Sequence, residues 1–259
     1  MVTTTAFEKA DLTGRVVAIT GGGGGIGKAS ALLCASRGAS LVIADLDETQ
    51  GANAVDEIRD AGGKAAFVKT DVTREDDVQA MVAFAVSTFG GLHGAFNNGG
   101  IMFSGTPLTD LPLEQWEKGV AVNLTGVFLC VKHQLRHMLK HGGGAIVNNS
   151  SASGMVGIPM AVNYVSTKHG IVGVTRAAAA EVSGQGVRVN AIMPGAVETP
   201  LLAGALEAPE VREAVAAGHP IGRISQPAEI AEAVAWLLSD ASSFITGACV
   251  TLDGGYTAL

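Results

Sequence analysis

Three side chains in this chain have types and spacing that could move a proton. Tyr164 and Lys168 are four positions apart, which places both on one face of a helix. A phenol has an ordinary pKa near 10 and is protonated at neutral pH, but a neighbouring ammonium stabilises its anion. Ser151, thirteen residues before Tyr164, could hydrogen-bond an oxygen beside the phenol. The pattern predicts proton transfer at an alcohol or ketone oxygen.

A glycine-rich turn near the N-terminus supplies a second chemical signal. The segment Thr20-Gly21-Gly22-Gly23-Gly24-Gly25-Ile26-Gly27 lies between a predicted strand and a predicted helix. Such a turn lets the backbone approach a pyrophosphate at the positive end of the helix. We expect Gly21, Gly25, Ile26 and Gly27 to bind a dinucleotide, the alternative being a flexible turn without a ligand. With the Tyr/Lys pair, the turn predicts hydride transfer between a nicotinamide cofactor and an alcohol or ketone.

Acidic residues at the ends of two later strands bear on which cofactor is used. Asp45 ends the second predicted strand, where a carboxylate can accept hydrogen bonds from both ribose hydroxyls and repel a 2′-phosphate. The positions that could attract that phosphate, Gly24 and Leu46, are not basic, so NAD is favoured over NADP. Asp45 could instead only start a turn. Asp71 and Val72 end the third strand and could hold the adenine edge, although an Asp there also suits a helix cap.

The elements that must position these residues alternate along the whole chain. Short β-branched runs predict strands at 15–20, 40–44, 65–70, 94–97, 145–149, 187–192 and 249–252. Alanine-rich stretches predict helices at 25–37, 48–61, 74–89, 113–141, 163–183 and 227–238. This alternation predicts an α/β protein with a single domain over residues 1–259. The expected fold is a Rossmann-type, doubly wound parallel sheet of about seven strands with helices on both faces.

One segment, from residue 195 to about residue 222, breaks the alternation. It contains Pro200, Pro209 and Pro220 and shows only a weak helical pattern. It follows the carboxyl end of a strand, where open α/β sheets bind ligands, and long insertions in compact domains are often functional. We predict a substrate lid, the alternative being a plain surface loop.

Composition excludes several classes of function. The chain of 259 residues carries a net charge of −7 and its Lys and Arg are scattered singly, so no nucleic-acid partner is expected. There is no apolar run of 18 residues and the first residues contain acids, so we expect neither a membrane span nor a signal peptide. Three widely spaced cysteines give no disulfide framework. A cytoplasmic, soluble protein is the expectation.

Three histidines have a helical spacing that could present ligands to a metal ion. His133, His137 and His141 fall at i, i+4 and i+8 of one predicted helix. They precede Gly142, and polar or positive side chains suit the end of a helix. No acidic or cysteine partner is obvious nearby in the sequence, so no metal site is predicted.

These motifs resemble the short-chain dehydrogenase/reductase family over essentially the whole chain. Thr20-Gly21-x-x-x-Gly25-Ile26-Gly27 looks like the family's cofactor fingerprint. Asn97-Asn98-Gly99-Gly100 is similar to its Asn-Asn-Ala-Gly element, with glycine in place of alanine at 99. The resemblance implies a cofactor site that, besides the residues named above, takes in Asn98, Pro194, Gly195, Val197, Thr199, Tyr164 and Lys168.

The resemblance also implies a catalytic tetrad and an assembly. Asn123-Leu124-Thr125-Gly126 resembles the motif of the fourth catalytic residue, and Asn149-Ser150-Ser151 looks like the catalytic-serine strand. By that resemblance the catalytic residues are Asn123, Ser151, Tyr164 and Lys168. Tyr164 would act as acid and base, Lys168 would lower its pKa and bind ribose, and Asn123 would hold a water that links Lys168 to solvent. A homotetramer, with the last helix and strand in its interfaces, is implied as well.

The residues expected around the reacting atoms are mostly apolar. They are Met102, Phe103, Met155, Val156, Ile158, Met160, Val197, Leu201, Leu202 and Leu206. Ser153, Asn163 and Glu198 are the polar options, and no basic cluster could clamp a phosphate or carboxylate. We expect Ser151, Ser153 and Tyr164 to bind an uncharged alicyclic, aromatic or steroid-like alcohol or ketone, with a diol or polyol as another option.

Two other functions fit parts of the pattern. A 3-oxoacyl-carrier-protein reductase would need NADPH and a basic surface, and the sequence shows neither. An NAD-binding sensor or scaffold would keep the fold without catalysis, but it has no need for Tyr164 and Lys168 together.

Overall fold

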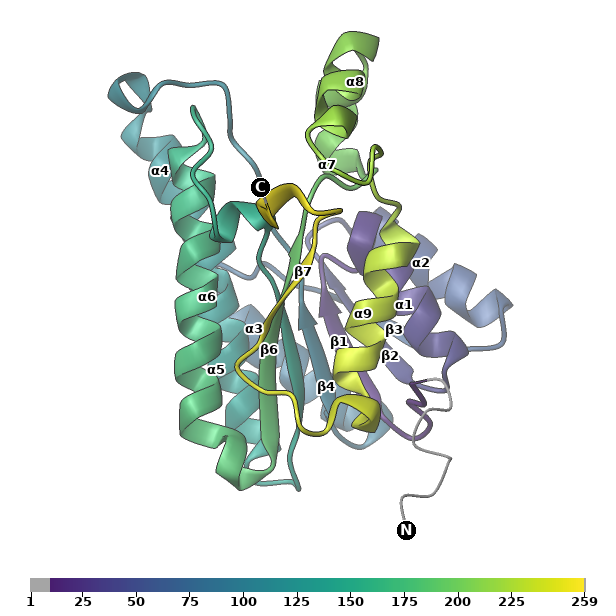
Figure 1. The fold of residues 1–259 in the computed structure, drawn as a ribbon. Helices are drawn as coiled ribbons and strands as arrows, with labels where there is room; N and C mark the ends of the chain where they lie inside the picture. Colours follow the sequence, from purple (N-terminus) through teal and green to yellow (C-terminus); the bar gives the residue numbers. More distant parts are fainter. Residues whose placement is uncertain (1–9, 259) are drawn as a thin grey trace.

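The β-branched and alanine-rich runs form one parallel sheet in the computed structural model, which describes residues 10–258 (Figure 1). The strand order is β3-β2-β1-β4-β5-β6-β7, and every neighbouring pair is parallel. The strands are β1 Val16–Thr20, β2 Ser40–Asp45, β3 Lys64–Lys69, β4 Gly94–Asn97, β5 Gly144–Asn149, β6 Val187–Pro194 and β7 Cys249–Leu252. Because parallel strands all end at one edge, the residues after β1, β2, β4, β5 and β6 meet there.

Helices cover both faces of this sheet, as the sequence predicted (Figure 1). The helices are α1 Gly25–Ser36, α2 Glu48–Asp60, α3 Glu75–Phe89, α4 Leu113–Val120, α5 Gly126–Met138, α6 Val162–Val182, α7 Pro200–Ala203, α8 Pro209–Ala217 and α9 Pro227–Leu238. Helices α1, α2 and α9 pack on one face, and α3, α5 and α6 pack on the other. The predicted single-domain Rossmann-type fold is therefore confirmed.

The two faces divide the side chains of each strand between two cores. In β1, Val17 and Ile19 join the core beneath α1 and α9, whereas Val16 and Ala18 join the core beneath α3 and α5. All five residues of β1 are buried. A strand buried on both sides reads as a continuous apolar run, which is why the period-two alternation is absent from the sequence.

The predicted helix at 113–141 differs from the observed one in an informative way. A π-helical segment, Ala121–Thr125, separates α4 from α5, and α5 ends at Met138. Asn123 lies in this segment and is only 2% exposed. Wide turns of this kind inside α-helices often occur at functional sites. The extra backbone residue rotates the start of α5 relative to α4 and turns Asn123 inward.

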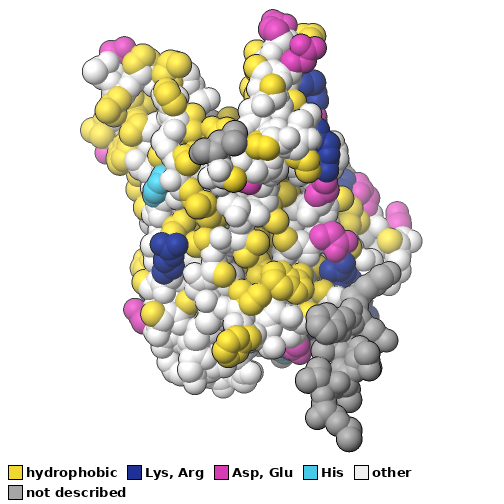
Figure 2. Space-filling model, in the orientation of Figure 1, with side chains coloured by type: hydrophobic (Ala, Val, Ile, Leu, Met, Phe, Trp, Pro, Cys, Tyr) yellow, Lys and Arg dark blue, Asp and Glu magenta, His cyan; other side chains and the backbone are white. Residues whose placement is uncertain are grey.

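The segment from residue 195 to residue 222 lacks a named strand, as expected, and contains α7 and α8. A proline begins each of these two helices, where its missing N–H has no partner to lose. In Figure 1, α8 projects beyond the end of the sheet, opposite α4, and Figure 2 shows the surface hollowed between these two projections.

The sequence predicted no membrane span and no metal site, and the structure can be compared with these predictions only over the residues that it describes. Within residues 10–258, no helix is both long and apolar enough to cross a membrane. The same residues contain no group of three or more His, Cys, Asp or Glu side chains that could hold a metal ion. Most of the N-terminal stretch that we expected not to be a signal peptide, residues 1–9, lies outside the described residues.

Candidate active site

The glycine-rich turn leaves β1 and enters α1 through conformations that other residues rarely adopt. Gly21 has a φ of +61° and Gly25 a φ of +50°. A Cβ on Gly27 would lie 2.0 Å from the carbonyl oxygen of Gly21, so only glycine fits there. No side chain caps the N-terminus of α1, and its first turn contains no acidic residue. The free N–H groups and the helix dipole therefore suit a bound anion such as a pyrophosphate.

The carboxylate of Asp45 lies against this turn. Its Oδ2 accepts a hydrogen bond from the Gly23 N–H at 2.9 Å, and its Oδ1 accepts one from the Asp47 N–H at 3.0 Å. Helix α2 is capped separately, because Asp47 accepts from the N–H groups of Thr49 and Gln50. Asp45 thus fixes the turn while placing negative charge at the edge of the predicted ribose site.

Asp71 makes a local turn instead of a helix cap. Its Oδ1 accepts hydrogen bonds from the backbone N–H and the hydroxyl of Thr73, at 2.9 and 2.6 Å. The N-cap of α3 is Arg74, so the capping alternative raised from the sequence is wrong. Val72 packs closely over Gly126, where a Cβ would meet its side chain at 2.8 Å. Contact of Asp71 and Val72 with adenine stays a prediction.

Asn98 joins the glycine-rich turn to the neighbouring strands. Its side-chain N–H groups donate to the carbonyl oxygens of Thr20 and Gly21, both at 3.1 Å. Its Oδ1 accepts from the side-chain amide of Asn149 at 2.9 Å. The Thr20 hydroxyl also accepts from the N–H groups of Asn98 and Gly99. Asn98 therefore holds β1, β4 and β5 in register at the edge where a cofactor would lie.

The predicted proton-transfer residues meet at the same edge. Tyr164 and Lys168 lie in the first two turns of α6, and Lys168 Nζ is 5.3 Å from the centre of the Tyr164 ring. Lys168 Nζ donates to the carbonyl oxygen of Asn149 at 2.8 Å, which ties it to the end of β5. Ser151 follows that strand and lies close enough to the Tyr164 side chain to influence its pKa. The i, i+4 spacing thus gives the shared helical face that the sequence predicted.

Burial shapes the electrostatics of this pair. Burial raises the pKa of Tyr164, and the hydrogen bond from Ser151 acts in the opposite direction. Burial also lowers the pKa of Lys168 to about 8, so its ammonium is costly but present at neutral pH. The expected lowering of the Tyr164 pKa by Lys168 stays a prediction, because the lysine bonds to Asn149.

Ser153 and Asn163 have different surroundings from those predicted. Ser153 is 5% exposed, its N–H donates to Ser151 Oγ at 3.1 Å, and the two hydroxyls are 3.2 Å apart. Ser153 therefore orients Ser151 directly. Asn163 is 2% exposed and its Oδ1 accepts from the Tyr164 N–H at 2.7 Å. That bond leaves Asn163 with a structural task at the start of α6.

Asn123 fixes the loop that follows β4. Its Oδ1 accepts from the Ile101 N–H and its Nδ2 donates to the Ile101 carbonyl oxygen, both at 2.8 Å. This two-point contact mimics a strand pair and explains why the π-helical segment turns the side chain inward. The role of Asn123 in holding a water stays a prediction.

The segment after β6 bridges the serine and the glycine-rich turn. The Ser151 hydroxyl lies 3.5 Å from the carbonyl oxygen of Pro194. Thr199 lies against Gly25, where a Cβ would meet the threonine methyl at 3.3 Å. Val197 is 3% exposed and bridges to Ser225. The residues predicted to face a nicotinamide are thus gathered between the catalytic and the pyrophosphate ends.

Exposed apolar side chains occur among the residues predicted around the reacting atoms, and also beside α4, where sequence reasoning missed them. Met155, Met160 and Leu201 of the predicted set are each about half exposed. A pocket of about 290 Å³ opens on the opposite projection and is lined by Leu108, Leu111, Leu113 and Trp116. Leu108 and Leu113 are 69% and 68% exposed. The several leucines close together in this stretch of the sequence could have indicated an exposed apolar surface. Glu198, a predicted polar contact, instead pairs with Arg212.

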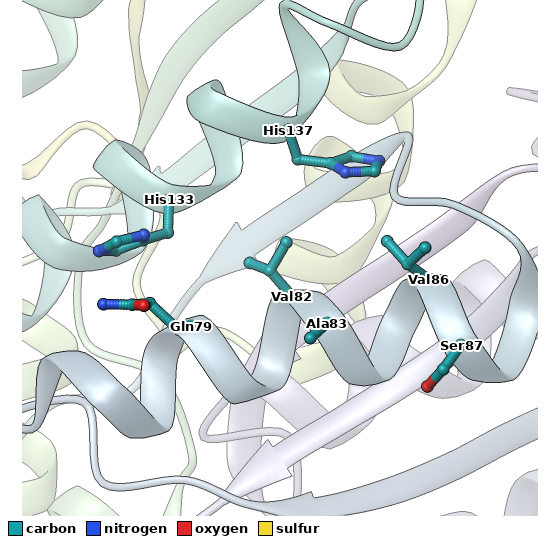
Figure 3. A pocket seen from close by; sticks show the side chains of 7 residues that line it. All are labelled: Gln79, Val82, Ala83, Val86, Ser87, His133 and His137. Atoms are coloured by element: carbon teal, nitrogen blue, oxygen red, sulfur yellow. The ribbon is translucent and has the colours of Figure 1, made fainter.

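Two of the three histidines, His133 and His137, line a separate pocket of about 360 Å³ between α3 and α5 (Figure 3). His133 Nε2 is 2.7 Å from Glu75 Oε1, and Lys132 Nζ is 2.6 Å from the same oxygen. The local sequence does not reveal this acidic partner, because Glu75 is 58 residues away in the chain. His137 stacks on His141 with ring centres 4.2 Å apart. The trio does not converge on one point.

Comparisons with known proteins agree with this architecture. A sequence model of the family described as enoyl-(acyl carrier protein) reductase matches residues 21–257. The chain is 47% identical over 251 residues to a 2,5-dichloro-2,5-cyclohexadiene-1,4-diol dehydrogenase of Sphingobium indicum, covering 96% of this chain and 99% of that protein. It is 46% identical over 244 residues to a cyclohexanol dehydrogenase of Acinetobacter sp., covering 94% and 95%. The crystal structure of gox2181 matches with a TM-score of 0.95 and 37% identity, covering 98% of this chain and all of that one.

Proposed function

The chain belongs to the short-chain dehydrogenase/reductase family, and from this premise we propose that it is an NAD-dependent dehydrogenase of cyclic secondary alcohols. It is an oxidoreductase that acts on a CH–OH group of a small alcohol with a nicotinamide cofactor. The observation that carries the finer proposal is the meeting of Ser151, Tyr164 and Lys168 beside a glycine-rich turn closed by Asp45.

The choice of NAD over NADP rests on charge at the end of β2. Asp45 is partly exposed and its carboxylate already accepts two backbone hydrogen bonds. A 2′-phosphate placed there would meet this negative charge. Leu46 is 61% exposed and offers no cation. Lys28, in the first turns of α1, is paired with Glu57. NAD, whose ribose offers two hydroxyl donors, fits this edge better.

The residues of the chain supply the proton chemistry. A bound nicotinamide ring would accept the hydride from the alcohol carbon. The Ser151 hydroxyl holds the substrate oxygen, and Tyr164 takes its proton as a ketone forms. Lys168 stabilises the phenolate by its positive charge once it is turned from Asn149 toward the tyrosine and the ribose. Ser153 keeps the Ser151 hydroxyl aimed at the oxygen.

The substrate class follows from the hollow and from the relatives. Met155, Met160 and Leu201 are half exposed, and Leu108, Leu111, Leu113 and Trp116 line an apolar pocket, so both sets offer apolar surface and no basic side chain. The two relatives named above act on a cyclohexadiene diol and on cyclohexanol. We therefore propose a six-membered alicyclic alcohol or diol, with residues 195–222 as the lid that covers it.

Two further proposals concern assembly and location. A homotetramer follows from family resemblance, and it is supported by the incompletely buried edge strand β7 and by the fully exposed Phe244. A cytoplasmic location is supported by three free cysteines, of which Cys34 and Cys130 are buried thiols. Light scattering after size exclusion tests the first.

The experiment that tests the function follows absorbance at 340 nm with NAD or NADP and a panel of alcohols. Cyclohexanol, cyclohexane diols, linear secondary alcohols, polyols and hydroxysteroids form the panel. We expect NAD reduction with cyclic alcohols, and loss of turnover with retained NAD binding in Tyr164→Phe. Turnover that survives this substitution would contradict the proton-transfer role. NAD binding without turnover on any alcohol would favour the sensor alternative.

A further inference from the structure

A buried histidine joins the two ends of the lid, residues 195–222. His219 follows α8 and is 7% exposed. Its Nδ1 is 2.7 Å from the carbonyl oxygen of Val215, one turn back on α8. Its Nε2 is 3.1 Å from the backbone nitrogen of Ala196, just after β6. One imidazole ring therefore bonds both ends of the lid.

The two partners dictate the protonation state of this ring. A carbonyl oxygen can only accept, so Nδ1 carries the hydrogen. A backbone N–H can only donate, so Nε2 is bare and accepts from Ala196. The imidazole is consequently neutral in this arrangement. A second proton on Nε2 would place two N–H groups against each other and break the bond to Ala196.

The His219 ring is closely packed between the backbone at Gly195 and the ring of Tyr256. A Cβ on Gly195 would lie 2.6 Å from His219 Nε2, so the ring lies directly against the backbone that follows Pro194. The ring of Tyr256 stacks on the other side, with centres 5.3 Å apart and planes tilted by 33°. A side chain larger than hydrogen at 195 would push His219 Nε2 away from its donor, the Ala196 N–H.

The ionisable groups around His219 are few and mostly engaged. The backbone of Asp253 also lies close to Gly195. Its carboxylate accepts hydrogen bonds from the N–H groups of Gly255 and Thr257 and from the Thr257 hydroxyl. On the lid side, Arg212 and Glu198 form an ion pair.

We propose that His219 is a positioning residue that holds Pro194–Val197 in the conformation that receives the nicotinamide end of the cofactor. The inference rests on the proposed function, since it assumes that a nicotinamide lies there. The bond to Ala196 is two residues from Pro194, whose carbonyl oxygen lies beside the Ser151 hydroxyl. When His219 is neutral, its bond to the Ala196 N–H holds the start of the lid in place. When His219 is protonated, that bond is lost.

The test compares the binding of NAD with that of ADP-ribose, which lacks the nicotinamide. Titration calorimetry on the full chain gives the ratio of the two affinities at pH 7 and pH 5.5, a range in which many imidazoles change charge. In the wild-type protein we expect NAD to lose about tenfold in affinity relative to ADP-ribose at the lower pH, because an unpaired buried N–H is costly.

Three variants separate positioning from mere structure. His219→Gln keeps an acceptor without a titrating ring, so its ratio should equal the wild-type ratio at pH 7 and stay flat with pH. His219→Leu removes the acceptor and should give the low ratio at both pH values. Tyr256→Phe, the matched control, keeps the ring stack and should behave like the wild type.

Each other outcome overturns the inference. If His219→Leu keeps the wild-type ratio at pH 7, or His219→Gln retains the pH dependence, His219 does not position the nicotinamide segment. If His219→Leu does not fold, the wild-type and Gln pH profiles still decide. If the wild-type protein binds ADP-ribose but neither NAD nor NADP, the proposed function itself fails, which is a different result from an unchanged ratio.

Discussion

Replacing Lys168 with methionine should make the protein more stable while abolishing its turnover. Lys168 is 5% exposed, and burial lowers its pKa from the ordinary 10.5 to about 8. That difference corresponds to about 3 kcal/mol of cost for the buried ammonium at neutral pH. Methionine has a similar length and carries no charge, so it removes the cost.

One favourable contact is lost at the same time. Lys168 Nζ donates to the Asn149 carbonyl oxygen at 2.8 Å, and leaving that acceptor unpaired costs about 1 kcal/mol. The net expectation is that the free energy of unfolding at pH 7 rises by about 2 kcal/mol. Turnover is lost because no ammonium remains to stabilise the Tyr164 anion.

The pH dependence gives this prediction a second, independent check. The pKa of Lys168 is lower in the folded state, so between about pH 8 and 10.5 the unfolded chain binds more protons. The wild-type protein therefore gains stability as pH rises through this window, and the advantage of Lys168→Met shrinks. Below pH 8 the full advantage remains.

Urea unfolding at pH 7 and pH 9.5 measures both effects. Lys69→Met is the matched control, because Lys69 is a surface lysine paired with Glu48 and its replacement should leave the free energy of unfolding nearly unchanged. A Lys168→Met protein that is less stable than the wild type at pH 7, or whose advantage is the same at both pH values, would refute the argument from burial.

Two more predictions concern the cofactor end. Asp45→Asn keeps an acceptor for the Gly23 N–H but removes the charge, so it should narrow the NAD/NADP preference about tenfold, measured as the ratio of kcat/KM values; an unchanged ratio would mean that Asp45 does not face the ribose. Gly99→Ala places a Cβ at 3.5 Å from Gly21 in a backbone without positive φ, so urea unfolding should show a gain of about 0.4–1 kcal/mol with unchanged NAD affinity. In Gly27→Ala, by contrast, the Cβ would overlap the Gly21 oxygen, and NAD binding should be lost.

The fold could be predicted from sequence because its signals are local. Strands such as Val16–Thr20 are buried on both faces and read as apolar runs, and the intervening helices end at glycines. Tyr164 and Lys168 could be paired for the same reason, since helical spacing alone brings them together. The roles of these two residues in turnover are still untested.

Contacts between distant parts of the chain could not be predicted. The π-helical segment at Asn123 depends on Ile101, 22 residues earlier. His219 accepts a hydrogen bond from the N–H of Ala196, 23 residues earlier. In each case the side chain satisfies backbone groups of a loop, and the choice of partner is made by the tertiary fold, which no local period encodes.

Residues that depart from ordinary preferences, such as a positive φ outside glycine or a buried lysine, lie at one edge of the sheet. This distribution has a physical reason. Turns at the opposite edge use glycine wherever φ is positive, as at Gly62, Gly90 and Gly142. Beside the active site, Met160 has a φ of +58°, the one residue other than glycine with positive φ among residues 10–258. Lys168 is buried at a cost nearby. Strain of this kind persists where surrounding contacts fix the backbone, here the bond from the Gly105 N–H to the Met160 carbonyl oxygen. Substitutions that stabilise without harming turnover should therefore be sought at the opposite edge, because relieving cost at this edge removes groups to which we assign roles in the reaction.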